Sequence, residues 1–178
     1  ASISQNLLTN STYCAIFGTS SYVGSKIYRN TLSGVASSIN TINQNSRSLV
    51  SGNVLSGINS NIKSNIQTNE CIISSNTLSG ISASINTVNQ CSRSLVSGNT
   101  LSGIQASIGG YYQTSLCRIT NNVLSGNPST NGSVTIAYGQ QDDNCEIDGN
   151  TLSGDGAQFF DNHQHEECTI NGNTLSGD

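Results

Sequence analysis

The sequence has few charged residues and few of the large side chains that usually fill a globular core. Of its 178 residues, 9% are Asp, Glu, Lys or Arg, and there is no Met, no Trp and a single Pro. Ordinary domains have about 25% charged residues. The six Lys and Arg residues form no basic patch, so we expect no nucleic-acid partner. No run of about 18 apolar residues is present, so we expect no membrane span.

The charges that are present divide the chain in two. All six basic residues lie before residue 122, where Glu70 is the only acid, and the other nine acids lie after it. We interpret the acidic end as a solvated cap that blocks stacking on another molecule, as in capped repeat proteins. A divalent-cation site is the alternative. The first interpretation predicts a monomer.

The sequence is instead rich in one repeat. Asn-Thr-Leu-Ser-Gly or Asn-Val-Leu-Ser-Gly occurs seven times, beginning at Asn30, Asn53, Asn76, Asn99, Asn122, Asn150 and Asn173. Successive copies are 23 residues apart, except for 28 after Asn122, and a weaker copy begins at Asn6. A fixed period of roughly 20–50 residues indicates a solenoid. Any function therefore belongs to a pattern over coils.

Each coil is numbered here from its Asn as position 0. Position 2 is Leu and position 4 is Gly in all seven copies. Positions 5, 7 and 9 (Val35, Ser37 and Ile39 in the first copy) alternate like a strand with one face inside, and positions 18 and 20 (Cys71 and Ile73) do the same. The alternation changes phase at Asn, which predicts a turn there with stacked, buried Asn amides. We expect three short strands per coil, at positions 1–3, 5–9 and 18–21. The variable segment at positions 10–17 is expected to absorb the five extra residues.

The phrase Ile-x-x-Asn-x-Leu-x-Gly resembles the right-handed parallel β-helix of the pectin-lyase-like superfold. The resemblance implies an all-β solenoid of seven to eight coils, with about 23 residues and three short strands per coil. We expect one domain over residues 1–178. Residues 1–29 would form an irregular N-terminal coil, 30–154 regular coils with an insertion in 127–145, and 155–178 an acidic C-terminal coil.

An even cysteine count in a small chain suggests disulfides and an oxidising compartment. The six are Cys14, Cys71, Cys91, Cys117, Cys145 and Cys168, without zinc-site spacing. Cys117, Cys145 and Cys168 lie in consecutive coils, about 4.8 Å apart and within disulfide reach. Buried free thiols are the alternative. The start of the chain is that expected of a mature protein after signal removal, so we predict a secreted, extracellular protein.

Positions 1 and 3 flank the inward Leu and must face solvent. They form an uncharged strip of two columns and seven rows, with rows about 4.8 Å and columns about 6.6 Å apart. Both spacings are close to water–water repeats in hexagonal ice. The strip consists of Thr31, Ser33, Val54, Ser56, Thr77, Ser79, Thr100, Ser102, Val123, Ser125, Thr151, Ser153, Thr174 and Ser176.

The strip resembles the Thr-x-Thr surface of β-solenoid antifreeze proteins, which implies ice and ordered water as the partner. Val replaces Thr at positions 54 and 123. The Val side chain has nearly the shape of Thr but has no hydroxyl group. A sugar site would lose a hydrogen-bond partner there, whereas a water-ordering surface would tolerate the change. A carbohydrate- or surface-binding module or adhesin is the alternative function. An ordinary solvated strand face is a further interpretation, since Thr, Val and Ser suit any such face.

Catalysis is not expected. Pectate-lyase-type chemistry needs clustered carboxylates for calcium and a basic residue as proton acceptor, and no Lys or Arg follows Arg118. The acids after residue 141 lie near His163 and His165, but two His alone are weak evidence for a metal site. Coils with short turns also offer little cleft. We therefore predict no catalytic residues, no metal and no cofactor.

Overall fold

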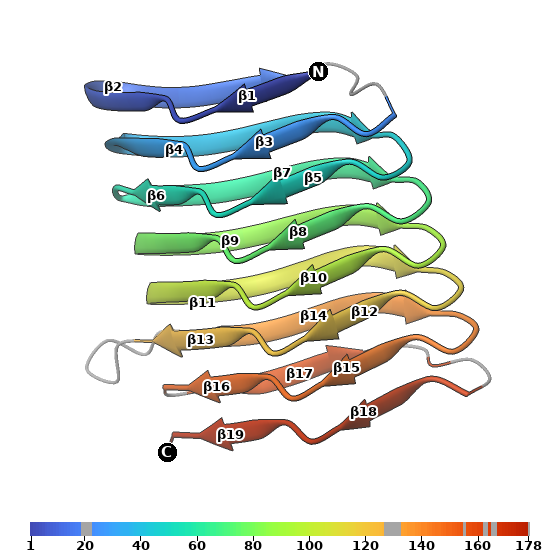
Figure 1. Cartoon of the computed structure of the whole chain (residues 1–178). Helices are drawn as coiled ribbons and strands as arrows, with labels where there is room; N and C mark the ends of the chain where they lie inside the picture. The colour runs from blue at the N-terminus through green and yellow to red at the C-terminus, as the bar shows by residue number, and fades with distance from the viewer. Residues whose placement is uncertain (19–22, 127–132, 155, 162–163, 165–166, 178) are drawn as a thin grey trace.

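The computed structural model describes residues 1–18, 23–126, 133–154, 156–161, 164 and 167–177. These residues form a parallel β-solenoid of about seven coils, with the two ends of the chain at opposite ends of the stack (Figure 1). The described residues contain no helix, and hence none long and apolar enough to cross a membrane. The predicted fold class is confirmed.

The strands stack into two parallel sheets. The eight-stranded sheet holds β1 (Ser2–Ser4), β3 (Lys26–Tyr28), β5 (Leu49–Ser51), β8 (Ile72–Ser74), β10 (Leu95–Ser97), β12 (Arg118–Thr120), β15 (Glu146–Asp148) and β18 (Thr169–Asn171). The eleven-stranded sheet holds β2 (Leu7–Gly18), β4 (Thr31–Gln44), β6 (Val54–Ser56), β7 (Asn59–Gln67), β9 (Thr77–Gln90), β11 (Thr100–Gln113), β13 (Val123–Gly126), β14 (Val134–Gln141), β16 (Thr151–Ser153), β17 (Gln158–Asp161) and β19 (Thr174–Ser176).

The core is a set of columns of identical or similar side chains. The Leu at position 2 is fully buried in six copies, from Leu32 to Leu152. Positions 18 and 20 also point inward, as predicted; Cys71 and Ile73 are examples, both with 0% exposure. A third column is formed by Ile at position 9, as in Ile85 and Ile108. In-register stacking gives each side chain the same neighbours above and below, so one repeated sequence fills the whole interior.

The predicted Asn column is confirmed as a buried ladder. Asn30, Asn53, Asn76, Asn99, Asn122 and Asn150 are at most 1% exposed. In each coil the main-chain N–H and Nδ2 of Asn both donate to Oδ1 of the Asn in the next coil; for Asn76 and Asn99 both distances are 3.0 Å. Nδ2 of Asn76 also donates to the carbonyl of Val50 at 3.0 Å. The ladder therefore pairs the polar groups of a turn that lies inside the protein.

A second ladder, which the sequence analysis missed, runs along position 14. Gln90 Nε2 donates to Gln67 Oε1 at 3.0 Å, and both side chains are fully buried. Sequence signal for this ladder exists, because Gln recurs at the spacing of the Asn repeat. Its members are Gln44, Gln67, Gln90, Gln113, Gln141 and Gln164.

Three strands per coil are present as predicted where β6, β7 and β8 form one coil, but the predicted end of the middle strand at position 9 is wrong. In β4, β9 and β11 the strand runs without interruption from position 1 to position 14. The segment at positions 10–14 is therefore strand and not variable loop. It extends because the inward Gln at position 14 pairs with its neighbours and holds the chain in the sheet.

The inward assignment of position 5 is also wrong. Val35, Ile58 and Ile81 are 47%, 47% and 50% exposed, whereas the residues at position 7 are buried. The side chains therefore change from the outward to the inward face after position 5, a second phase change that the sequence analysis did not predict. The chain bends at this change of face, which we call the glycine corner, and Gly at position 4 makes the bend possible. At Gly80, φ is +155°, and an added Cβ would lie 1.8 Å from the carbonyl oxygen of Gly57.

The five extra residues after Asn122 enter at this same corner. Gly103 pairs with Gly126, an offset of 23, but Ala106 pairs with Val134, an offset of 28. The insertion therefore precedes Val134, and the prediction that positions 10–17 absorb it is wrong. Residues 127–132 themselves lie outside the described residues.

The expected disulfides are absent, and the alternative of free thiols is the correct one. None of the six cysteines is part of a disulfide, and Cys14, Cys71, Cys117 and Cys145 are buried. Cys117 and Cys145 Sγ donate to carbonyls of their own turns, those of Thr114 and Asp142, at 2.9 Å. Stacking thus brings the two coils together, but each thiol has a backbone partner. A hydrogen bond with Cys117 and burial raise the pKa of Cys145.

Candidate functional site

The Thr/Val-Leu-Ser strip occupies one face of the eleven-stranded sheet. Its two outward columns are in register through all seven predicted rows. Thr100, for example, lies between Thr77 and Val123, and Ser102 lies between Ser79 and Ser125. The structure therefore brings together all fourteen residues singled out from the sequence. Leu7 and Thr9 of β2 extend the columns by one further row beside Thr31 and Ser33.

The two columns differ in exposure. In the Thr/Val column, Val54, Thr77, Thr100 and Val123 are exposed. The Ser column is half-buried from Ser33 to Ser153. The Thr and Val side chains at these four positions are therefore more exposed than the Ser side chains, and the Leu between them is buried. Small side chains on a regular sheet make this surface level along the solenoid axis.

The strip is anchored directly to the asparagine ladder. Each residue at position 1 follows a ladder Asn, and its main-chain N–H donates to the carbonyl of the Asn one coil earlier. For Thr77 to Asn53 the distance is 2.8 Å, and for Thr100 to Asn76 it is 2.9 Å. Two sets of hydrogen bonds thus fix every row relative to the next. The strip is rigid because its supporting turn is buried and fully paired.

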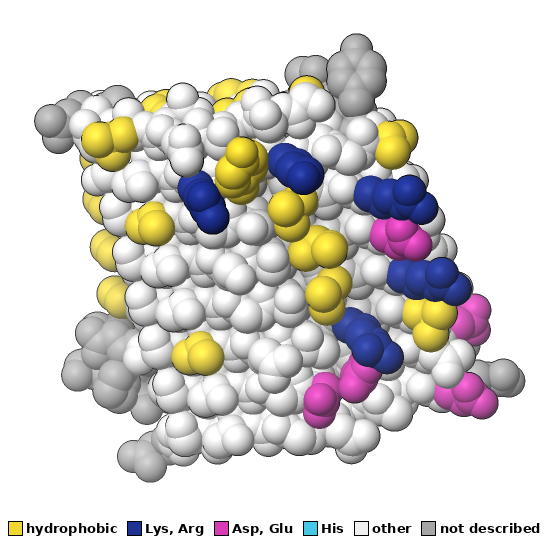
Figure 2. Space-filling view, viewed as in Figure 1, with side chains coloured by type: hydrophobic (Ala, Val, Ile, Leu, Met, Phe, Trp, Pro, Cys, Tyr) yellow, Lys and Arg dark blue, Asp and Glu magenta, His cyan; other side chains and the backbone are white. Residues whose placement is uncertain are grey.

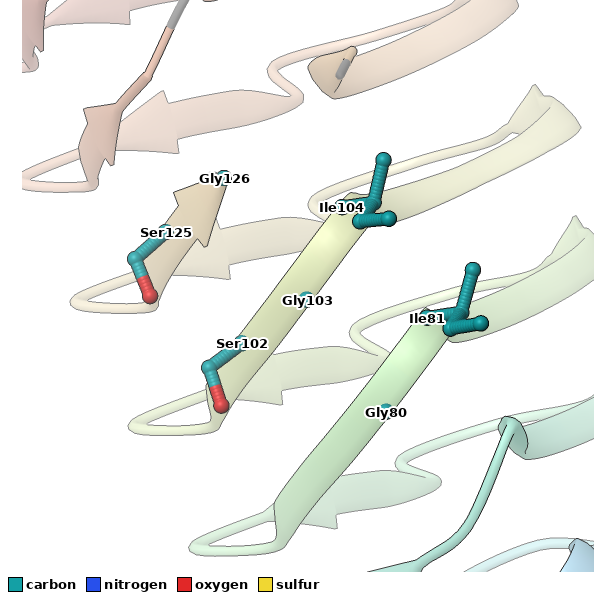
Figure 3. A pocket seen from close by; sticks show the side chains of 7 residues that line it. All are labelled: Gly80, Ile81, Ser102, Gly103, Ile104, Ser125 and Gly126. Atoms are coloured by element: carbon teal, nitrogen blue, oxygen red, sulfur yellow. The ribbon is translucent and has the colours of Figure 1, made fainter. Parts of the chain in front are cut away.

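A shallow groove borders the Ser column. It is lined by Gly80, Ile81, Ser102, Gly103, Ile104, Ser125 and Gly126, and its volume is about 370 Å³. The glycines form the floor, and in the close view Ser102 and Ser125 point away from Ile81 and Ile104 (Figure 3). The Ile side chains at position 5 form an exposed apolar ridge beyond the groove. Sequence reasoning placed these side chains inside, so it missed both the ridge and the groove.

Charge is absent from the strip itself. The described ion pairs lie elsewhere, between Arg47 Nε and Glu70 Oε2 and between Arg118 Nε and Glu146 Oε2, each at 3.0 Å. The surface over β13, β16 and β19 shows no acidic or basic side chain (Figure 2). An uncharged surface can approach ordered water or a neutral polymer without desolvating an ion.

The acidic region does not form a metal centre among the described residues. No group of three His, Cys, Asp or Glu side chains there is close enough to hold an ion. Glu146 instead pairs with Arg118, and Asp142 accepts a hydrogen bond from Gln140 at 2.8 Å. His163, His165, Asp155 and Glu166 lie outside the described residues.

Comparison with known proteins identifies no relative. The chain matches no protein-family model, no curated protein and no solved structure.

Proposed function

We propose that this protein binds ice and its ordered surface water through the Thr/Val-Leu-Ser strip. The observation that carries the proposal is the in-register stacking of seven uncharged rows, centred on Thr77 and Thr100. A single water-mediated contact is weak. Only many contacts acting together, at a regular spacing, hold a protein on a growing crystal.

The geometry of the strip supports this role. Rows in a parallel sheet repeat at about 4.8 Å, and residues two apart along a strand are about 6.6 Å apart. The two amide ladders and the backbone bonds keep that spacing fixed, so the surface loses little conformational entropy on adsorption. The ladder bonds of Asn76 to Asn99 directly support the central rows.

The groove and ridge supply the methyl groups that the Ser column lacks. Antifreeze surfaces with Thr in both columns offer a hydroxyl and a methyl at each site, whereas Ser offers only a hydroxyl. Here Ile81 and Ile104 lie across the glycine floor from Ser102. Hydroxyls on one side and apolar carbons on the other favour ordered water in the groove between them.

A direct experiment tests the proposal. Thermal hysteresis and ice-crystal shaping are measured for the unmodified protein and for Thr100→Tyr, with circular dichroism to check the fold. We expect hysteresis in the unmodified protein and loss of most of it in the variant, because Tyr holds the neighbouring rows off the ice. Arg47→Tyr, at an exposed turn, is the matched control and should retain activity.

Two results would contradict the proposal. Absence of hysteresis in the unmodified protein would leave the strip as an ordinary solenoid surface. Full hysteresis in a correctly folded Thr100→Tyr variant would assign ice binding to another face.

A carbohydrate- or surface-binding module is the second candidate. The groove favours it, because a lining of both Ser and Ile side chains, such as Ser102 and Ile104, also suits a neutral polysaccharide chain. Co-sedimentation with insoluble polysaccharides would support this alternative if hysteresis is absent. In either case we propose a secreted, extracellular, non-catalytic protein without a cofactor, built on the pectin-lyase-like β-helix.

A further inference from the structure

An apolar column runs along the outer face of the eight-stranded sheet, on a different sheet from the Thr/Val-Leu-Ser strip. Leu49, Ile72 and Leu95 stack in register at position 19 of β5, β8 and β10. Their side chains face outward and are half-buried. Hydrophobic side chains are visible in a column over these central coils, with basic side chains around them (Figure 2).

The fold does not require aliphatic side chains at position 19. The same outward column holds Lys26 before these three residues, and Arg118 and Glu146 after them. The inward neighbours at position 20, such as Val96 and Ile119, are fully buried whether position 19 is apolar or charged. The core is therefore complete without the three aliphatic side chains, and their apolar surface can contact a ligand.

A cleft of about 300 Å³ lies at the end of this column. It is lined by Arg93, Ser94, Leu95, Leu116 and Arg118. Leu95 pairs with Arg118, and the same offset of 23 places Arg93 beside Leu116. The two arginines therefore occupy one diagonal of the cleft, and the two leucines occupy the other. The volume is that of a site for a small molecule.

Leu116 is the least expected residue of the cleft. Its φ is +64°, a left-handed conformation that is unfavourable for a bulky side chain, and the residue is 41% exposed. The equivalent residue of the next coil is Asn144, with φ of +59°, and Asn is suited to that conformation. Neither core packing nor backbone preference accounts for Leu116, whereas an apolar lining of the cleft does.

The lining of the cleft carries two positive charges and no negative one. Arg93 is exposed, and no ion pair to it occurs in the described part of the chain. Arg118 pairs with Glu146 through Nε at 3.0 Å, but its side chain is still 58% exposed. Both guanidinium groups are therefore accessible to an anion, and Arg binds carboxylates through several N–H donors at once.

The neighbouring acids leave this charge largely uncompensated. Glu70, one coil before Arg93, is held by Arg47 in an ion pair. Asp143 accepts the main-chain N–H of Leu116 at its carbonyl, but it does not line the cleft. The cleft therefore combines exposed cations with an adjoining apolar column, which is the complement of an anion on an alkyl chain.

We propose that this cleft binds a single-chain amphiphilic carboxylate, a fatty acid of medium chain length. The carboxylate lies between Arg93 and Arg118, and the alkyl chain lies along Leu95, Ile72 and Leu49. The three rows of the column extend over about 10 Å, at about 4.8 Å per row. The proposal does not depend on ice binding, because none of these residues belongs to the strip.

Isothermal titration calorimetry with decanoate, below the concentration at which it forms micelles, tests the proposal. We expect saturable binding of one decanoate per chain. Affinity should rise from hexanoate to decanoate by up to about fourfold per carbon, because each added carbon covers more of the column. Acetate, which has the head group alone, and decyltrimethylammonium, which has a similar chain and the opposite charge, should each bind at least tenfold more weakly. Absence of decanoate binding would overturn the proposal, as would equal binding of the cationic amphiphile.

Two substitutions locate the site. Arg93→Gln should weaken decanoate binding about tenfold, because it removes one of the two cations. Lys63→Gln is the matched control, since it removes the same charge from an exposed residue of β7 on the other sheet and should leave the affinity within about twofold. Leu95→Thr should also weaken binding about tenfold and reduce the dependence on chain length. Circular dichroism checks that each variant is folded. An equal loss in Arg93→Gln and Lys63→Gln would show that only the overall charge matters, which would overturn the site.

Two further variants separate this proposal from the others. Thr100→Tyr should bind decanoate like the unmodified protein, whatever its effect on thermal hysteresis. Ile81→Ser, in the groove beside the Ser column, should also retain decanoate binding. A tenfold loss in Ile81→Ser without a loss in Leu95→Thr would place the alkyl chain in that groove and overturn the assignment to the cleft.

Discussion

Gln90 and Gln67 form a hydrogen bond that runs against the direction of the asparagine ladder. Gln90 Nε2 donates to Gln67 Oε1 in the preceding coil at 3.0 Å, whereas Asn76 donates to Asn99 in the following coil. A coil therefore donates an amide hydrogen bond to both of its neighbours, through different corners. Relative sliding of two coils would break both sets of bonds, which is why the outward columns keep their register.

Removing one ladder amide should destabilise the whole stack. Asn76→Ala leaves the main-chain N–H and Nδ2 of Asn53 without their acceptor at 3.0 and 2.9 Å in a buried turn. We expect the free energy of unfolding to fall by about 1–3 kcal/mol. Urea denaturation measures the change. Asn86→Ala, at an exposed position in the same strand, is the control, and equal stability of the two variants would mean that the ladder does not contribute.

The glycine corner should be intolerant of any side chain. In Gly80→Ala the new Cβ would meet the carbonyl oxygen of Gly57 at 1.8 Å, and φ of +155° is unfavourable for Ala. We expect a loss of about 3 kcal/mol or more in unfolding free energy, measured by thermal and urea denaturation. Gly98→Ala, where φ is +60° and nothing lies within 4 Å, should cost only about 1 kcal/mol. Similar losses of unfolding free energy in the two variants would show that the backbone at Gly80 can shift to accommodate the added methyl group.

Two isoleucines four residues apart should respond very differently to truncation. Ile81 is 50% exposed and Ile85 is 1% exposed. Ile85→Ala removes core contacts and should lower the unfolding free energy by about 2–5 kcal/mol. Ile81→Ala should change it by no more than about 0.5 kcal/mol. A large loss at Ile81 would restore the sequence-based assignment of position 5 to the interior.

Substitutions of one central Thr can separate the contribution of its hydroxyl from that of its shape and lack of charge. Thr77→Val keeps the shape of the strip and copies the residue found at Val54, so most thermal hysteresis should remain. Thr77→Lys adds a charge that holds solvent at the surface, so most activity should be lost. If both variants lose hysteresis equally, the Thr hydroxyl is required for ice binding and the shape of the strip is not sufficient.

The side chains that point into the core could be predicted at positions where the residue type and the alternation along the strand indicate the same face. The Leu at position 2, the Ile or Val at position 20 and the ladder Asn all lie where the repeat places them. Position 5 shows where this reasoning fails. Its Ile and Val side chains suit either face, and alternation cannot show at which residue a corner reverses the phase. Close approach of the Gly57 carbonyl to Gly80 fixes that point, and it is a contact between coils.

Cysteine pairing was likewise beyond the sequence. Stacking at about 4.8 Å allows a disulfide between Cys117 and Cys145, but it does not require one. In the structure both thiols donate to backbone carbonyls of their own turns, a contact that depends on local turn geometry.

The sequence by itself determined the coil length, the solenoid and the membership of the Thr/Val-Leu-Ser strip, because a 23-residue repeat leaves only one way to stack equivalent residues. Only the tertiary structure decided the corner at Gly80 and the exposed Ile ridge with its groove. These features arise from contacts between neighbouring coils. The residue pattern within one coil does not predict which atoms of the adjacent coils it will contact.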